Sequence, residues 1–139
     1  MADPTAHEGA CHCGAVRFRV RLTGGFAAAS RCTCSFCRMR GAVALTARVG
    51  DLVILEGADH LALYQFGSRT AEHHFCRICG IHTHHRRRSD PGEYGVSAAC
   101  LRGISPFDFA EVPILDGTNH PSDGHAERIV GVLRAVMDD

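Results

Sequence analysis

The distribution of cysteines constrains this chain more than any other feature of its sequence. Seven of the eight cysteines fall into three tight clusters. The clusters are Cys11-His12-Cys13, Cys32-Thr33-Cys34-Ser35-Phe36-Cys37 and Cys76-Arg77-Ile78-Cys79. Thiolates separated by one or two residues can converge on one metal ion, and zinc takes four protein ligands in structural sites but three in catalytic sites. Two pairs make four ligands and the triplet makes three, so the sequence predicts one closed zinc site and one open site.

The rest of the composition favours thiolate chemistry over disulfides. Residues 1–8 have neither the basic nor the apolar region of a secretory signal, so we expect a cytoplasmic protein in a reducing compartment. Disulfides within the clusters would also close very small rings with poor geometry. Lys plus Arg and Asp plus Glu are both 15, which disfavours nucleic acid and membrane surfaces as partners. No apolar run approaches the roughly 20 residues of a membrane helix.

The length of the chain predicts a single domain over residues 1–139, and hydrophobic periodicity predicts that it is rich in β-strands. Val16, Phe18, Val20 and Leu22 alternate with three arginines, Arg17, Arg19 and Arg21. This cationic face is either exposed to solvent on the outside of the sheet or attracts an anionic substrate. Further strands are expected at 26–31, 42–49 and 52–55 (these two as a hairpin), 61–66, 70–75 and 94–101.

The C-terminal part, residues 102–139, changes character. After an irregular stretch with three prolines, apolar residues recur at helical spacing, and Asp123 is a plausible N-cap. The spacing predicts a C-terminal amphipathic helix whose apolar residues are Ile129, Val130, Leu133, Val136 and Met137.

The two cysteine pairs together predict a four-thiolate zinc site. Cys11 and Cys13 would share one face of a strand, and Cys76 and Cys79 would meet through a tight turn. Such a site would join distant parts of the chain and add to its folding free energy. Other groupings, such as Cys11 and Cys13 with Cys32 and Cys34, remain open.

The triplet has two interpretations. In one, the second zinc is structural and a fourth protein ligand closes it; the candidates are His12, His82, His84, His85 and Cys100. In the other, the fourth position takes water or a substrate thiol, since a soft site of three thiolates binds a further thiolate well. On a strand, His82 and His84 would share a face. Arg86 to Arg88 form either a solvated basic loop or an anion patch, and Cys100 is expected to be a small buried hydrophobe.

Over about residues 9–101, the motifs of this chain resemble those of a known family. Gly9-x-Cys11-His12-Cys13-Gly14-Ala15-Val16-x-Phe18, Cys32-x-Cys34-Ser35-x-Cys37-Arg38-x-x-Gly41, Phe66-Gly67-Ser68 and Phe75-Cys76-x-x-Cys79-Gly80 occur in the order found in the glutathione-dependent formaldehyde-activating enzymes. That family also includes centromere protein V. The resemblance implies a mainly β fold of packed antiparallel sheets with two zinc ions. It further implies that Cys11, Cys13, Cys76 and Cys79 hold the structural ion and that Cys32, Cys34 and Cys37 hold the catalytic one.

The resemblance also implies an activity, the joining of glutathione to formaldehyde as S-hydroxymethylglutathione, which is a carbon–sulfur lyase reaction in reverse. We expect a small thiol to add to a small aldehyde as a hemithioacetal, with His82 or His84 protonating the new alkoxide. The alternative is a thiol-binding or structural zinc module that acts as a carrier, or that binds a partner through Arg86 to Arg88, without turnover.

Overall fold

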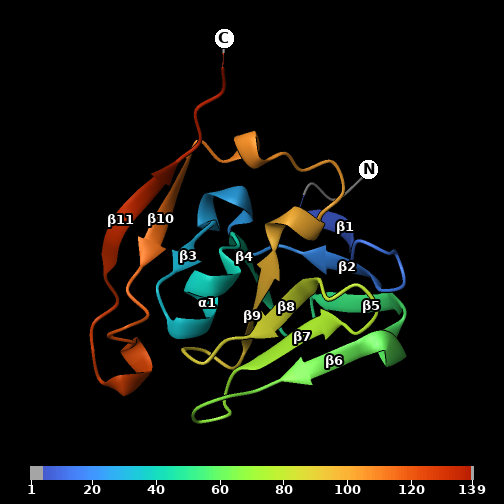
Figure 1. Ribbon diagram of the computed structural model, residues 1–139, viewed down its shortest axis with the longest axis horizontal. Coiled ribbons are helices and arrows are strands. Elements are labelled where there is room, and N and C mark those ends of the chain that lie inside the picture. The colour runs from blue at the N-terminus through green and yellow to red at the C-terminus, as the bar shows by residue number, and fades with distance from the viewer. Residues whose placement is uncertain (1–4, 139) are drawn as a thin grey trace.

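The protein is built from three β-sheets and one short helix (Figure 1), in a computed structural model that describes residues 5–138. The first sheet has the strand order β1 (Ala6–Ala10), β2 (Arg17–Arg21), β5 (Leu52–Glu56). The second has the order β4 (Ala44–Arg48), β9 (Glu93–Ser97), β8 (His82–Arg86), β7 (Glu72–Cys76), β6 (Leu61–Tyr64). The third has the order β11 (Ile129–Arg134), β10 (Glu111–Leu115), β3 (Arg31–Cys32).

Helical segments in this described part are short. The α-helix α1 spans Ser35–Arg40. The 3₁₀ turns are η1 (Gly25–Ala28), η2 (Ala58–His60), η3 (Ala98–Cys100), η4 (Pro106–Asp108) and η5 (Pro121–Asp123). None of these helices is long and apolar enough to cross a membrane. The prediction of a mainly β fold with antiparallel sheets is confirmed, and β3 with β10 is the one parallel pair among the described strands.

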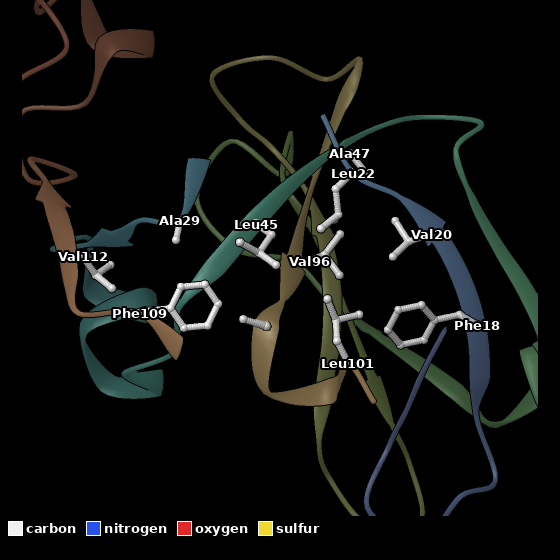
Figure 2. Close-up of a cluster of buried hydrophobic side chains, with 11 residues drawn as sticks. Phe18, Val20, Leu22, Ala29, Leu45, Ala47, Val96, Leu101, Phe109 and Val112 are labelled. Carbon is white, nitrogen blue, oxygen red and sulfur yellow. The ribbon is translucent and has the colours of Figure 1, made fainter. Parts of the chain in front are cut away.

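The larger of two buried apolar clusters packs between the first two sheets and extends towards the third (Figure 2). The alternation predicted for β2 is confirmed, because Phe18 and Val20 are fully buried while Arg19 and Arg21 are exposed. The other members of the cluster are Leu22, Ala29, Leu45, Ala47, Val96, Ala98, Leu101, Phe109 and Val112. Burial of one large apolar side chain stabilises the fold by about 1.5–3 kcal/mol. This core therefore fixes how the sheets pack against one another.

Two strand predictions were wrong in their pairing or form. Residues 42–49 and 52–55 do contain strands, but they form no hairpin, because β4 pairs with β9 and β5 pairs with β2. In the segment 26–31, the first three residues belong to the 3₁₀ turn η1, and the strand β3 begins only at Arg31. Local apolar runs indicate strands but not which neighbour supplies the ladder.

The predicted C-terminal helix was wrong. Ile129–Arg134 is the strand β11, which pairs antiparallel with β10. Asp123 ends the turn η5, and His120 caps that turn. The positions that suggested a helix are also compatible with a short strand, and the β-branched residues Ile129, Val130 and Val132 favour the extended form.

Candidate functional site

Cys11, Cys13, Cys76 and Cys79 lie together where the first sheet meets the second. Cys11 directly follows β1 and Cys76 is the last residue of β7, while Cys13 and Cys79 lie in the turns that follow. All four sulfurs lie within 4.8 Å of one another. The grouping that the two pairs predicted is therefore the one in the structure. Cys11 and Cys13 meet through a turn, however, and not on a strand as expected.

The spacing of these sulfurs fits a tetrahedral zinc ion. The Cys13 sulfur lies 3.6 Å from that of Cys11 and 3.7 Å from that of Cys76. Zinc–sulfur bonds of about 2.3 Å hold neighbouring sulfurs about 3.8 Å apart in a tetrahedron. The backbone N–H groups of Val16 and Ile78 donate to the sulfurs of Cys11 and Cys76, at 3.3 and 3.4 Å. This cysteine-rich group could bind a metal ion.

The sulfurs of Cys32, Cys34 and Cys37 form a second cysteine-rich group, also within 4.8 Å of one another. Cys32 ends β3, Cys34 is the N-cap of α1, and Cys37 lies in its first turn. The helix ends at Gly41, whose φ of 65° favours glycine. This short helix returns the chain past the cluster.

Each sulfur of this triplet accepts one N–H donor. The backbone N–H of Cys34 donates to Cys32 at 3.4 Å, and that of Cys37 donates to Cys34 at 3.3 Å. The Arg40 guanidinium lies 3.9 Å from the Cys37 sulfur. Hydrogen bonds to the charged form of a thiol favour that form, so the cluster is arranged to carry thiolates.

The pKa shifts agree with a cluster that shares negative charge. Hydrogen bonds from Cys32 and Cys37, with the backbone N–H of Cys37 as a further contribution, lower the pKa of Cys34 to about 2. Hydrogen bonding with Cys34 raises the pKa of Cys32. These shared hydrogen bonds favour a negative charge on the triplet.

Gly117 leaves room for the triplet. A Cβ atom there would lie against the Cys32 sulfur and only 2.6 Å from the backbone nitrogen of Cys34. The parallel pairing of β3 with β10 brings this loop to the cysteines, since Leu115 is opposite Cys32 and the N–H of Gly117 donates to the Thr33 hydroxyl at 3.0 Å. The sequence reasoning missed Gly117, because the pairing of β3 with β10 was not foreseen.

The triplet opens into a cavity of about 490 Å³. All three cysteines line it, together with Arg40, His73, His85 and residues of the loops after β8 and β10. Cavities of this size hold small molecules. The triplet is therefore accessible to a small ligand.

No fourth Cys, His, Asp or Glu ligand atom joins the triplet within residues 5–138. Of the candidates for closing the site, His85 lines the same cavity but does not join the triplet. His12 is exposed in the turn beside Cys11, and Cys100 is half-buried with its thiol 3.5 Å from the His82 carbonyl. The geometry favours the open interpretation of the triplet.

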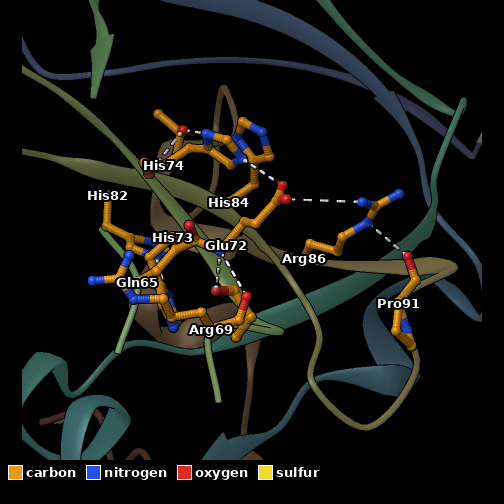
Figure 3. A network of polar contacts seen from close by, with 11 residues as sticks. Gln65, Arg69, Glu72, His73, His74, His82, His84, Arg86 and Pro91 are labelled. Atoms are coloured by element: carbon orange, nitrogen blue, oxygen red, sulfur yellow. Dashed lines mark hydrogen bonds and ion pairs between the residues drawn. The ribbon is translucent and has the colours of Figure 1, made fainter. Parts of the chain in front are cut away.

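His82 and His84 do not share a face, contrary to expectation. A β-bulge between His74 and Phe75 shifts the register of β7 against β8, so that His74 is opposite His84 and Phe75 is opposite His82. His84 stacks on His74 at 4.6 Å on one face, while His82 contacts His73 on the other. Figure 3 shows these two groups of histidines, with Glu72 in contact with Arg86 nearby.

The arginines of residues 86–88 are each paired and form no free cationic loop. Arg86 lies 3.9 Å from Glu72 and donates to the Pro91 carbonyl at 2.8 Å (Figure 3). Arg87 pairs with Glu93 at 3.4 Å, and Arg88 pairs with Asp123. An anion patch for a macromolecular partner is therefore not favoured here.

Comparison with known proteins agrees with this site. The family described as glutathione-dependent formaldehyde-activating enzyme matches residues 6–110. A relative from Halomonas elongata, which is named as a glutathione-dependent formaldehyde-activating enzyme, is 39% identical over 80 residues, or 52% of this chain. The matched part of the chain spans 50% of the length of that curated relative.

A solved structure gives the same result for the fold. The crystal structure of a Rhodobacter sphaeroides protein is 62% identical, with a TM-score of 0.75, over 77% of this chain and 98% of that chain. Because the family matches more than half of the chain, including all three cysteine clusters, the chain belongs to the glutathione-dependent formaldehyde-activating enzyme family.

Proposed function

We propose that this protein is an enzyme that joins a small thiol of the glutathione type to formaldehyde or another small aldehyde. The observation that carries this proposal is the open cavity on which all three cysteines of the triplet lie, with no fourth protein ligand among residues 5–138. The family membership and the name of the Halomonas relative support the same substrates. The product is a hemithioacetal, and the reverse reaction is that of a carbon–sulfur lyase.

We further propose that both cysteine-rich groups hold zinc. Cys11, Cys13, Cys76 and Cys79 would hold a structural ion, and Cys32, Cys34 and Cys37 would hold one at the cavity. Bound there, zinc supplies a Lewis acid that favours the thiolate form of a thiol whose free pKa is about 8.5. The soft sulfur donors and the tetrahedral spacing of the first group support zinc over harder ions.

The residues of the chain bind and orient the two reactants. The backbone N–H groups of Cys34 and Cys37 donate to the sulfurs of Cys32 and Cys34 and so fix the triplet. Arg40 places a positive charge beside Cys37. Holding thiol and aldehyde together in the cavity removes much of the entropic cost of a bimolecular step. The substrate sulfur attacks the carbonyl carbon, a C–S bond forms, and the C=O π pair moves onto oxygen, which then takes a proton.

The cysteines also bear on where the protein works. All eight are free thiols. We propose the cytoplasm as its compartment, because a reducing environment keeps such thiols available for metal.

The test is to follow adduct formation from glutathione and formaldehyde by NMR. The wild type is expected to exceed the uncatalysed rate, and Cys34→Ser is expected to fall to it. Cys100→Ser is the matched control, since Cys100 lies outside both cysteine-rich groups; it should retain the wild-type rate. A wild-type rate equal to the uncatalysed rate would reduce the protein to a thiol carrier.

A further inference from the structure

Three imidazoles meet on one face of β7 and β8, beside the cysteine triplet. The ring nitrogens of His73, His82 and His85 lie within 4.8 Å of one another. The β-bulge produces this cluster, because it places His82 and His85 on the same side as His73. His73 and His85 line the cavity, whereas His82 does not.

Contacts with Arg40 determine where the protons of this cluster lie. An Arg40 Nη1 atom lies 3.1 Å from His82 Nδ1. A guanidinium can only donate, so Nδ1 accepts and a neutral His82 carries its proton on Nε2. That Nε2 lies 3.1 Å from His73 Nδ1. His73 Nδ1 must therefore accept in turn, which leaves the proton of a neutral His73 on its own Nε2.

Burial keeps these imidazoles neutral. Burial first, and the Arg40 charge second, lower the pKa of His73 to about 4 and that of His82 to about 2. Only 3% of His73 is exposed. Neutral imidazoles with one donor and one acceptor each are what the hydrogen-bond chain requires.

The same chain argues against a metal ion at the three histidines. A neutral imidazole binds metal through a nitrogen that carries no proton. Both nitrogens of His82 are already in use, one accepting from Arg40 and the other donating to His73. The histidine cluster therefore offers a hydrogen-bond donor, the Nε2–H group of His73, to a small molecule in the cavity.

Packing holds His73 in one orientation in the cavity wall. The Phe36 ring lies 4.2 Å from the His73 ring, and the His85 ring stacks on it at 4.9 Å. His85 fits because Gly95 has no side chain; a Cβ atom there would lie 2.9 Å from His85 Nδ1. A fixed donor in a cavity wall needs little reorganisation when charge develops beside it.

We propose that His73 donates a hydrogen bond from its Nε2–H group to the carbonyl oxygen of the aldehyde, and that Arg40 and His82 fix the tautomer that makes this possible. This inference rests on the proposed function. As the substrate sulfur forms its bond to carbon, the C=O π pair moves onto oxygen, and His73 stabilises that negative charge. His73 stays neutral throughout, and water supplies the proton that completes the hydroxyl group.

The first test compares His73→Phe with His74→Phe. Phenylalanine keeps a ring at position 73 but removes the donor, so kcat should fall by about 100-fold, with a much smaller change in the KM for the thiol. His74 is the neighbouring residue on the opposite face, where it stacks on His84, and its variant should keep the wild-type kcat. A wild-type kcat in His73→Phe would overturn the inference and leave the proposed function standing, whereas an inactive wild type would overturn both.

The second test reads the tautomer directly by ¹⁵N NMR of the imidazoles, which needs no turnover. The wild type should show neutral His73 with its proton on Nε2 from pH 5.5 to 8. His82→Phe should lose this fixed tautomer, because His73 Nδ1 then has no donor. A proton on His73 Nδ1, a cationic His73 at pH 7, or uptake of Co²⁺ by the three histidines would each overturn the proposed hydrogen-bond chain.

Discussion

At the scale of single residues, Gly117 has a specific role beside the triplet that the cysteine pattern does not reveal. It approaches the triplet so closely that a Cβ atom would lie 2.6 Å from the Cys34 nitrogen. We expect Gly117→Ala to displace the loop after β10 or the triplet, and to reduce metal at this site and turnover by at least about tenfold. Gly131→Ala is the control, since a Cβ atom there meets only Ile114 at 3.7 Å. Equal turnover in the two variants would show that the triplet tolerates this displacement.

The single residue His84 contributes to the pH dependence of the free energy of unfolding. Burial lowers its pKa to about 3, from an ordinary value near 6.5. Below pH 6.5 the unfolded chain takes up a proton that the folded protein does not, so stability is lost as the pH falls towards the folded pKa. By pH 5.5 this loss should reach about 1.4 kcal/mol for His84.

Urea unfolding at pH 7.5 and pH 5.5 checks this value. The wild type should lose about 1.4 kcal/mol more between the two pH values than His84→Gln does, because the variant lacks the titrating group. The comparison cancels any pH effect of the cysteines, which both proteins share. The same pH dependence in both proteins would mean that His84 titrates normally in the folded state.

At the scale of elements, the sequence predicted strands well where one face is buried. The alternation in residues 16–22 identifies β2 because Phe18 and Val20 enter the core. Prediction from hydrophobic periodicity failed for β11, because five of its six residues are exposed and burial imposes no alternation of apolar and polar residues. The bulge in β7 and β8 was also beyond prediction, because a register shift depends on the partner strand.

The cysteines were predictable for a different reason. Seven cysteines occur in short motifs whose spacing is typical of metal ligands, so the two groups could be predicted from spacing, and their sulfurs do converge. Their assignment as zinc ligands stays a prediction. His73 and Gly117 escaped notice because only the pairing of distant strands brings them to the cavity.

The pairing of β10 with β11 can be tested through Glu111 and Arg134. They are opposite each other in the ladder, with an ion pair of 2.8 Å on the exposed surface. A double-mutant cycle with Glu111→Gln and Arg134→Gln should give a coupling energy of about 0.5 kcal/mol at low salt. The coupling should decrease in high salt. Zero coupling at low salt would contradict this register.

At the scale of the whole molecule, the two cysteine-rich groups differ in what they connect. Cys11 and Cys13 follow β1 of the first sheet, and Cys76 and Cys79 lie at and after the end of β7 of the second, so this group joins the two sheets. The triplet lies at the edge of the cavity, where the third sheet and α1 meet. These positions are the basis for our proposal that the first group stabilises the fold and the second carries out the chemistry.

Zinc content per chain tests this division most directly. Elemental analysis of protein purified without added metal should give two zinc ions in the wild type and one in each of Cys34→Ser and Cys79→Ser. Only Cys34→Ser should keep the thermal stability of the wild type, because its remaining zinc still joins the two sheets. One zinc ion in the wild type, or an unchanged zinc content in Cys34→Ser, would contradict a metal site at the cavity and the chemistry proposed there.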